Sequence, residues 1–219
     1  MTRVKICGIR EEIHALAAAE AGADFIGLVF APSQRQVTPA QAERVAVAVK
    51  KSSNATEIVG VFVNMPAPMV NKLVDFCHLD WVQLSGDEPW KYCGEITKPL
   101  IRAIRVGQRQ SPQEICAVLA TGARVFTNQK HIYLLDSQVK GKYGGTGMTF
   151  DWSLARQAAE HFPVIIAGGL TPENIAQAIK IVAPWGVDVS SGVEVGGVKD
   201  IVKIRTFIEA VRRADDNQR

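Results

Sequence analysis

The sequence predicts a single-domain (β/α)₈ (TIM) barrel, and three observations support this fold class. Eight short apolar segments rich in β-branched residues alternate with segments of helical periodicity, in a unit that repeats about every 20 to 30 residues. Strands that are apolar throughout are typical of parallel strands covered by helices. The chain of 219 residues has room for eight such units. A doubly wound sheet shares the alternation, but the count of eight favours the closed barrel.

The expected strands are short apolar runs that end at glycine or polar residues. The first run, around Ile6, is broken by Gly8, and apolar residues then follow at helical spacing up to a stop at Gly22. The eight strands are expected at residues 4–7, 25–30, 57–63, 81–84, 100–106, 132–136, 164–167 and 186–190. Their carboxyl ends are expected to meet at one face of the barrel.

Helical segments between the strands are indicated by their start signals. Proline follows threonine or serine at Thr38-Pro39 and Ser111-Pro112, and proline is favoured in the first turn of a helix. Clear helices are expected at residues 39–51, 67–76, 112–120, 152–160, 172–182 and 199–213.

Composition is that of a folded enzyme of one domain, which we expect to span residues 1–219. Hydrophobic residues make up 47% of the chain and charged residues 21%, and no Pro/Ser-rich or charged linker divides it. The longest apolar runs are the length of a strand and too short to cross a bilayer. The first residues lack a secretory or transit pattern, so the expected location is the cytoplasm.

Charge and cysteine content argue against several classes of partner. The net charge of +3 comes from 25 basic and 22 acidic residues spread along the chain, which is no nucleic-acid or membrane footprint, although it could steer an anionic substrate. The four cysteines, at 7, 77, 93 and 116, have no Cys-x-x-Cys spacing and no nearby pair of histidines. We therefore expect reduced thiols, no disulfide framework and no metal site. The sequence leaves the oligomeric state open.

Three polar side chains at predicted strand ends could carry chemistry. Cys7 ends the first strand and Asp136 ends the sixth, so both are expected at the same mouth of the barrel, as a base and an acid on opposite sides of one ligand. Arg35 follows the second strand and could hold a carboxylate with its planar fork. Each residue also has a structural interpretation, as a packed thiol, a helix cap or a solvated arginine.

Three glycine-containing segments that follow the last three strands predict a phosphate site. Glycine allows the backbone to approach an anion closely, and a short helix starting near Ser191 would direct its positive end at that anion. Asp188, which opens the last of these segments, is expected to bind substrate. The expected phosphate-binding residues are Gly145, Gly168, Gly169, Ser190, Ser191 and Gly192.

Nucleotide-binding motifs do not occur. No G-x-G-x-x-G follows the first strand, and Gly-x₄-Gly-Lys-Ser/Thr is absent as well. A dinucleotide cofactor therefore has little support, and we expect no cofactor.

The sequence resembles the phosphoribosylanthranilate isomerase family of tryptophan biosynthesis over nearly its whole length. The first and last matching segments are the most specific, whereas the glycine loops are common to many phosphate-binding barrels. The matching segments are Val4-Lys5-Ile6-Cys7-Gly8-Ile9, Gly22-Ala23-Asp24, Gly60-Val61-Phe62-Val63-Asn64, Val82-Gln83-Leu84, Leu134-Leu135-Asp136, Gly144-Gly145-Thr146-Gly147, Phe150-Asp151-Trp152, Gly168-Gly169-Leu170 and Asp188-Val189-Ser190-Ser191-Gly192-Val193-Glu194.

The resemblance implies a cofactor-free Amadori rearrangement of N-(5-phosphoribosyl)anthranilate to 1-(2-carboxyphenylamino)-1-deoxyribulose 5-phosphate. It implies that Cys7 is the general base, that Asp136 is the general acid and that Arg35 contacts the anthranilate moiety. It also implies that the glycine loops hold the phosphate of this small phosphosugar-anthranilate substrate.

Two segments depart from the family pattern. Many members have His-Gly after Val-Gln-Leu in the fourth strand, whereas this chain has Ser85-Gly86. A histidine that tunes the site would therefore be missing, which affects efficiency more than the type of reaction. Residues 122–130 match nothing specific in the family and are interpreted as a variable loop.

Two alternative functions remain open from the residues alone. Another phosphate-binding barrel enzyme, such as a sugar-phosphate epimerase or an indole-glycerol-phosphate synthase-like lyase, would need metal-binding histidines or a catalytic lysine at a strand end. The four histidines lie at predicted surface or structural positions, and Lys5 is expected deep in the barrel, on the same strand face as Cys7. A phosphosugar-binding regulatory protein is the non-enzymatic alternative, against which the presence of both Cys7 and Asp136 argues.

Overall fold

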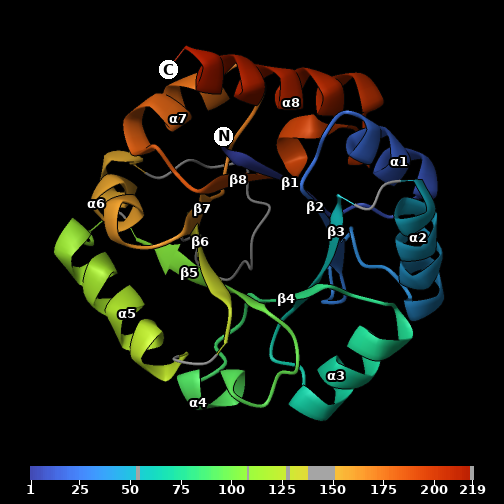
Figure 1. Ribbon diagram of the computed structural model, residues 1–219, viewed down its shortest axis with the longest axis horizontal. Coiled ribbons are helices and arrows are strands. Elements are labelled where there is room, and N and C mark those ends of the chain that lie inside the picture. Colours follow the sequence, from blue (N-terminus) through green and yellow to red (C-terminus); the bar gives the residue numbers. More distant parts are fainter. Residues whose placement is uncertain (53–54, 108, 127–128, 138–150, 218–219) are drawn as a thin grey trace.

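The computed structural model, which describes residues 1–52, 55–107, 109–126, 129–137 and 151–217, is a closed barrel of eight parallel strands. The strands form the inner ring and the helices surround it (Figure 1). Neighbouring strands pair in chain order from β1 to β8, and β8 pairs with β1 to close the ring. The predicted (β/α)₈ fold is confirmed.

The strands lie within one or two residues of their expected positions. They are β1 (Arg3–Cys7), β2 (Phe25–Val29), β3 (Glu57–Phe62), β4 (Trp81–Leu84), β5 (Leu100–Val106), β6 (His131–Ser137), β7 (Val164–Ile166) and β8 (Gly186–Val189). A short antiparallel pair, β9 (Glu194–Val195) and β10 (Val198–Lys199), follows the single-turn helix η1 (Ser191–Val193).

The outer helices follow their strands in the same order. They are α1 (Glu12–Glu20), α2 (Pro39–Ser52), α3 (Ala67–Phe76), α4 (Trp90–Cys93), α5 (Pro112–Val125), α6 (Ser153–His161), α7 (Ile175–Val182) and α8 (Ile201–Asp216). In the described part of the chain, none of them has the length and apolar character that crossing a membrane requires.

The helices differ from the expected bounds at two places. The four-residue helix α4 is too short to show a periodic pattern and was not among the helices whose bounds were predicted. Helix α5 continues to Val125, so residues 122–125 are helical and not part of a loop. Gly122 is buried there, and a Cβ at this position would lie 2.7 Å from Tyr133 Oη and 2.8 Å from the Trp90 ring.

The core has two layers, and their arrangement directs side chains at the site. Residues such as Val4 and Ile6 pack between the strands and the helices, so the alternate positions on β1, Lys5 and Cys7, face the barrel interior. The interior cluster contains Phe25, Val59, Trp81, Ile101, Ile132 and Ile165 nearer the amino ends of the strands, and Leu134 and Ala167 nearer the carboxyl ends. This apolar plug fills one end and leaves polar residues at the other.

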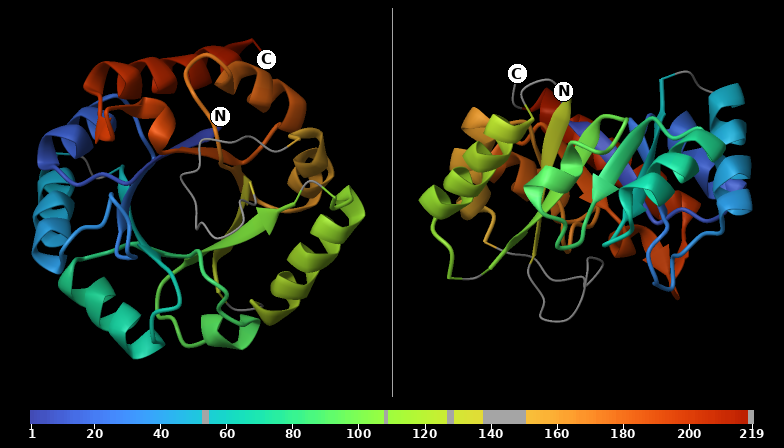
Figure 2. Two further views of the ribbon diagram at one scale, coloured as in Figure 1. Left: turned by 180° about the vertical axis from the view of Figure 1, so that it is seen from behind. Right: turned by 90° about the horizontal axis from the view of Figure 1, so that it is seen from below.

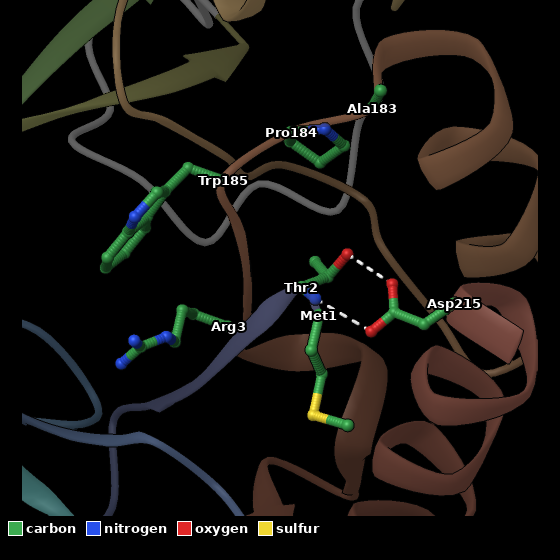
Figure 3. Close-up of a pocket in the computed structure, with 7 residues that line it drawn as sticks. All are labelled: Met1, Thr2, Arg3, Ala183, Pro184, Trp185 and Asp215. Carbon is green, nitrogen blue, oxygen red and sulfur yellow. Dashed lines mark hydrogen bonds between the residues drawn. The ribbon is translucent and has the colours of Figure 1, made fainter. Parts of the chain in front are cut away.

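The two ends of the chain are joined at the amino-terminal face of the barrel, opposite the predicted site. Thr2 donates from its backbone N and its Oγ1 to the Asp215 carboxylate, over 2.7 and 2.6 Å (Figure 3). Arg212 Nη1 donates to Thr2 O over 2.7 Å. Figure 2 shows both termini at this end. A shallow surface pocket of about 450 Å³ lies beside this contact, bordered by Arg3 and Trp185.

Replacement of Gly122 by alanine is expected to destabilise the protein by about 1–3 kcal/mol, although alanine favours a helix by about 1 kcal/mol over glycine. The added methyl group would collide with Tyr133, whose hydroxyl donates to Leu119 O over 2.8 Å. Urea unfolding measures the change, with the exposed Thr121→Ala on the same helix as the matched control. A Gly122→Ala variant more stable than wild type would contradict this packing.

Candidate active site

A cavity of about 370 Å³ opens at the carboxyl ends of the strands and collects five of the predicted site residues. Its apolar wall comes mainly from β2, β3, β5 and β6 and contains Val29, Val61, Val63, Ala103 and Leu134. Its polar lining includes the predicted residues Cys7, Arg35, Asp136, Asp188 and Ser190. One enclosed space with an apolar wall and a few converging polar groups is typical of a small-molecule site.

Cys7 lies at the carboxyl end of β1 with 8% of its surface exposed. The chain turns directly after it at Gly8, whose φ of +79° belongs to the region that glycine adopts without strain. Across the strand pair, Gly27 leaves room for the thiol, because a Cβ there would lie 2.9 Å from Cys7 Sγ. Burial raises the pKa of Cys7, while the positive charges of Lys5 and Lys199 act to lower it.

Asp136 occupies an inward position on β6 and is partly buried. Burial raises its pKa to about 6, and the nearby negative charge of Asp188 acts in the same direction. Its Oδ1 accepts a hydrogen bond from the backbone N of Ser137 over 2.8 Å, which opposes the rise. Near neutral pH the carboxyl group therefore has an appreciable protonated fraction, as a proton donor requires.

Asp188 forms a buried ion pair with Lys5. Lys5 Nζ lies 2.8 Å from Asp188 Oδ1, and the two residues face each other in the register of β1 and β8. Lys5 has no exposed surface, which confirms the expected position deep in the barrel.

Arg35 belongs to a second charged cluster at the wall of the cavity. Its Nε and Nη2 donate to the two carboxylate oxygens of Glu194, each over 2.7 Å. Lys199 Nζ lies 2.6 Å from Glu194 Oε1 and donates to Ser190 O over 2.9 Å. The bidentate bond with Glu194 raises the pKa of Arg35 and fixes its guanidinium plane.

The loops after β7 and β8 approach each other closely at the predicted phosphate site. Gly168 and Gly169 have φ values of +87° and +64°, and Asn174 Nδ2 donates to Gly169 O over 2.8 Å. A Cβ on Gly192 would collide with the carbonyl oxygen of Leu170, so only glycine fits this approach. The short helix predicted near Ser191 is confirmed as η1. The predicted contribution of Gly145 falls outside the described residues.

Several polar residues of the site were missed from the sequence. Lys199 and Glu194 lie after β8 and reach the site only through the turn formed by β9 and β10. Arg105 lines the cavity from β5, where Nη1 lies 3.0 Å from Asp87 Oδ1 and Nη2 donates to Ser85 O. Its inward position, two residues after Ala103, was the signal that could have found it.

No group of three or more His, Cys, Asp or Glu side chains that could hold a metal ion occurs among the residues that the structure describes. None of the four histidines lines the cavity.

Comparison with known proteins identifies the family. Residues 4–210 match the family model described as N-(5'-phosphoribosyl)anthranilate (PRA) isomerase. The chain belongs to this isomerase family. An N-(5'-phosphoribosyl)anthranilate isomerase of Dehalococcoides mccartyi is 44% identical over 218 residues, which cover 100% of this chain and 99% of the relative. One of Roseiflexus castenholzii is 47% identical, covering 96% of this chain and 98% of the relative.

Solved structures of the isomerase family have the same fold. The phosphoribosyl anthranilate isomerase of Thermotoga maritima has a TM-score of 0.83 and 36% identity, and the match covers 97% of this chain and all of that chain. A family structure in complex with reduced 1-(o-carboxyphenylamino)-1-deoxyribulose 5-phosphate has a TM-score of 0.80 and 35% identity, with the same coverage. The predicted isomerase of tryptophan biosynthesis is confirmed, and the epimerase, lyase and non-enzymatic alternatives are wrong.

Replacement of Asp136 by asparagine is expected to stabilise the protein at pH 7 by about 1–3 kcal/mol, because the pKa of this carboxyl group is raised on folding to about 6. The native state of the wild type loses stability as the pH rises from about 4 to 6, since a buried carboxylate must then carry its charge. The gain should therefore be present at pH 7 and disappear below pH 4. Urea unfolding at both values measures it, with the exposed Asp75→Asn as control, and an equal effect at both values would contradict the raised pKa.

Proposed function

We propose that this isomerase rearranges N-(5-phosphoribosyl)anthranilate to 1-(2-carboxyphenylamino)-1-deoxyribulose 5-phosphate without a cofactor, with Cys7 as general base and Asp136 as general acid. The observation that supports it most is a thiol and a carboxyl group with a raised pKa on one cavity, next to an apolar wall. We place the activity in one catalytic domain of residues 1–219, in the cytoplasm, with no nucleic-acid or membrane partner.

The first step opens the sugar ring. Protonated Asp136 gives its proton to the furanose oxygen, and the bond between that oxygen and C1 breaks as the anilino nitrogen donates its lone pair to C1. The product of this step is an open-chain iminium ion, and Asp136 is left as a carboxylate. A carboxyl group with a pKa near 6 suits this role better than an ordinary aspartate, which is almost fully ionised at neutral pH.

The second step moves a proton off carbon. The Cys7 thiolate removes the proton from C2, and the electron pair forms the C1–C2 double bond while the iminium nitrogen regains its lone pair. The resulting enolamine then tautomerises to the ketone by proton transfer to C1. The iminium makes the C2 proton acidic, so the base has to act only after the ring has opened.

The bound substrate is oriented by its two anionic ends. The phosphate is held by backbone N–H groups of the loops at Gly168, Gly169 and Ser190 to Gly192, where glycine allows close approach. The anthranilate ring lies against the apolar wall. Arg35, whose plane is fixed by Glu194, donates to the anthranilate carboxylate.

The protonation states required for catalysis belong to a minor form of the free enzyme. Burial raises the pKa of Cys7 above the ordinary value of a thiol, whereas the pKa of Asp136 is about 6, so between these two pKa values the pair is mostly a neutral thiol and a carboxylate. In the active form, Asp136 is protonated and Cys7 is a thiolate. The share of this form falls about tenfold for each pH unit that separates the two pKa values.

The pH profile of kcat/KM is expected to be bell-shaped, rising through a pKa near 6 and falling above the pKa of the thiol. Asp136→Asn should lower kcat by about 10²–10⁴-fold and remove the bell, so that the remaining activity rises with pH as the thiolate forms. Steady-state fluorescence assays of substrate loss measure both. Near-normal kcat would place the acid elsewhere, and lost affinity with intact kcat would make Asp136 a binding residue.

Cys7→Ala is expected to abolish turnover while product affinity stays within several-fold, because the thiolate acts on a proton in the transition state and not on the charge of the ligand. Cys116→Ala, at a partly buried thiol on α5, is the matched control and should keep its activity. Activity of Cys7→Ala near that of wild type would exclude the thiol as base.

Gly169→Asp is expected to raise KM sharply, since it places a carboxylate beside the phosphate, and inorganic phosphate should compete with substrate. Gly169→Asn is the matched control, because asparagine has the same shape and meets the same φ of +64° without a charge. An equal KM for the two variants would show that the loop does not contact the phosphate.

A further inference from the structure

Lys5 is a buried cation for which the proposed mechanism has no use so far. Its side chain has no exposed surface and lies inside the barrel, two residues before Cys7 on the same face of β1. A charge is costly to bury unless it is paired, and a barrel interior of this kind could be filled by an apolar side chain at lower cost. A lysine at this position therefore calls for a reason beyond packing.

Two observations define the position of the ammonium group of Lys5. Asp188 Oδ1 accepts from Nζ over 2.8 Å, which fixes the group on the side of β8. A Cβ on Gly27 would lie 3.1 Å from Lys5 Nζ and 2.9 Å from Cys7 Sγ, so both atoms border the same small space. They are therefore within about 6 Å of each other, the range over which a neighbouring charge strongly favours an ionised group.

The thiol is surrounded by charges of both signs. Burial is the largest effect and raises the pKa of Cys7. Among the neighbouring charges, Lys5 has the largest effect and lowers this pKa. Asp188 comes next and raises it, and Lys199 follows and lowers it. Lys5 lowers the pKa of Cys7 both by its charge and by a hydrogen bond. The charged and titratable groups that face the thiol come from β1, β6, β8, β10 and the segment after β2, and they are Lys5, Asp136, Asp188, Lys199 and Arg35.

We propose that Lys5 is a positioning residue of the isomerase: anchored by Asp188, its ammonium group stabilises the Cys7 thiolate that takes the proton from C2. The proposal rests on the proposed function, in which Cys7 is the base. Lys5 acts on the thiolate and not on the substrate, and Asp188 keeps the ammonium group in place. Because Lys5 and Asp188 face each other where β1 pairs with β8, the strand pairing that closes the barrel also holds the cation that stabilises the Cys7 thiolate.

This role has a measurable consequence in the free enzyme. Without Lys5 the thiol lies in a buried cavity with Asp188 unpaired beside it, and both effects favour the neutral thiol. The thiolate fraction at a given pH, and with it the share of the active form, should then fall by about tenfold or more.

The test is the rate at which iodoacetamide alkylates Cys7, followed from pH 6 to 11 by mass spectrometry of the peptide that contains it. This readout needs no substrate and separates Cys7 from the other three thiols. In Lys5→Met we expect the midpoint of the profile to move up by one pH unit or more, and kcat to fall about tenfold or more at pH 7 with KM for substrate nearly unchanged. Arg3→Met removes a cation from the same strand, farther from the thiol, and is the control that should leave the midpoint unchanged.

A second variant keeps the test decisive if an unpaired Asp188 prevents folding. Lys5→Met/Asp188→Asn removes both charges, and circular dichroism shows which variant is folded. Because Lys5 affects Cys7 more strongly than Asp188 does, the midpoint should still move up, by less than in the single variant. An unchanged or lowered midpoint in the folded variant would overturn the proposal. An active Cys7→Ala enzyme would instead refute the proposed base while leaving the coupling of Lys5 to the thiol measurable.

Discussion

The pairing of β1 with β8 is the constraint on which the rest of the structure depends. It closes the ring of strands and sets Lys5 opposite Asp188, so that a buried ion pair forms on the seam inside the barrel. The same register brings Cys7 next to Ser190 and to the loop that carries the predicted phosphate-binding residues. An error of one residue in this register would turn the lysine and the thiol toward the helices and expose apolar residues to the cavity. Fold and chemistry therefore rest on one alignment of two strands.

The interior of the barrel is divided between stability and chemistry. Phe25 and Trp81 meet edge to face, with ring centroids 5.9 Å apart, in the apolar plug near the amino ends of the strands. Toward the carboxyl ends of the strands, polar side chains join the apolar ones at the inward positions, and the cavity opens there. Charged groups are held at short distances at this end of the barrel, where burial is the main cause that raises both pKa values, that of the Cys7 thiol and that of the Asp136 carboxyl group, the latter to about 6.

The sequence predicts this fold well because parallel strands covered by helices are apolar at most positions, which sets them apart from the amphipathic helices. It also places Cys7 and Asp136 at the mouth of the barrel, where both line one cavity, since each is a polar side chain at the end of a predicted strand. The Arg35–Glu194–Lys199 cluster was missed because it depends on how a turn after β8 folds back, which no local pattern encodes. Residues 122–125 were assigned to a loop because they match nothing specific in the family, whereas the helix continues there and Gly122 permits its close packing against Tyr133.

The proposed roles of Cys7 and Asp136 require substrate to lie between them, and a crystal structure of this protein with reduced 1-(o-carboxyphenylamino)-1-deoxyribulose 5-phosphate tests that directly. Cys7 Sγ should lie within about 4 Å of C2, and the Asp136 carboxyl group should lie within about 2.6–3.2 Å of the oxygen at C4. The phosphate should contact the loops that contain Gly169 and Ser191. A ligand bound in the opposite direction, or C2 on the far side of the cavity from Cys7, would contradict the assignment of acid and base.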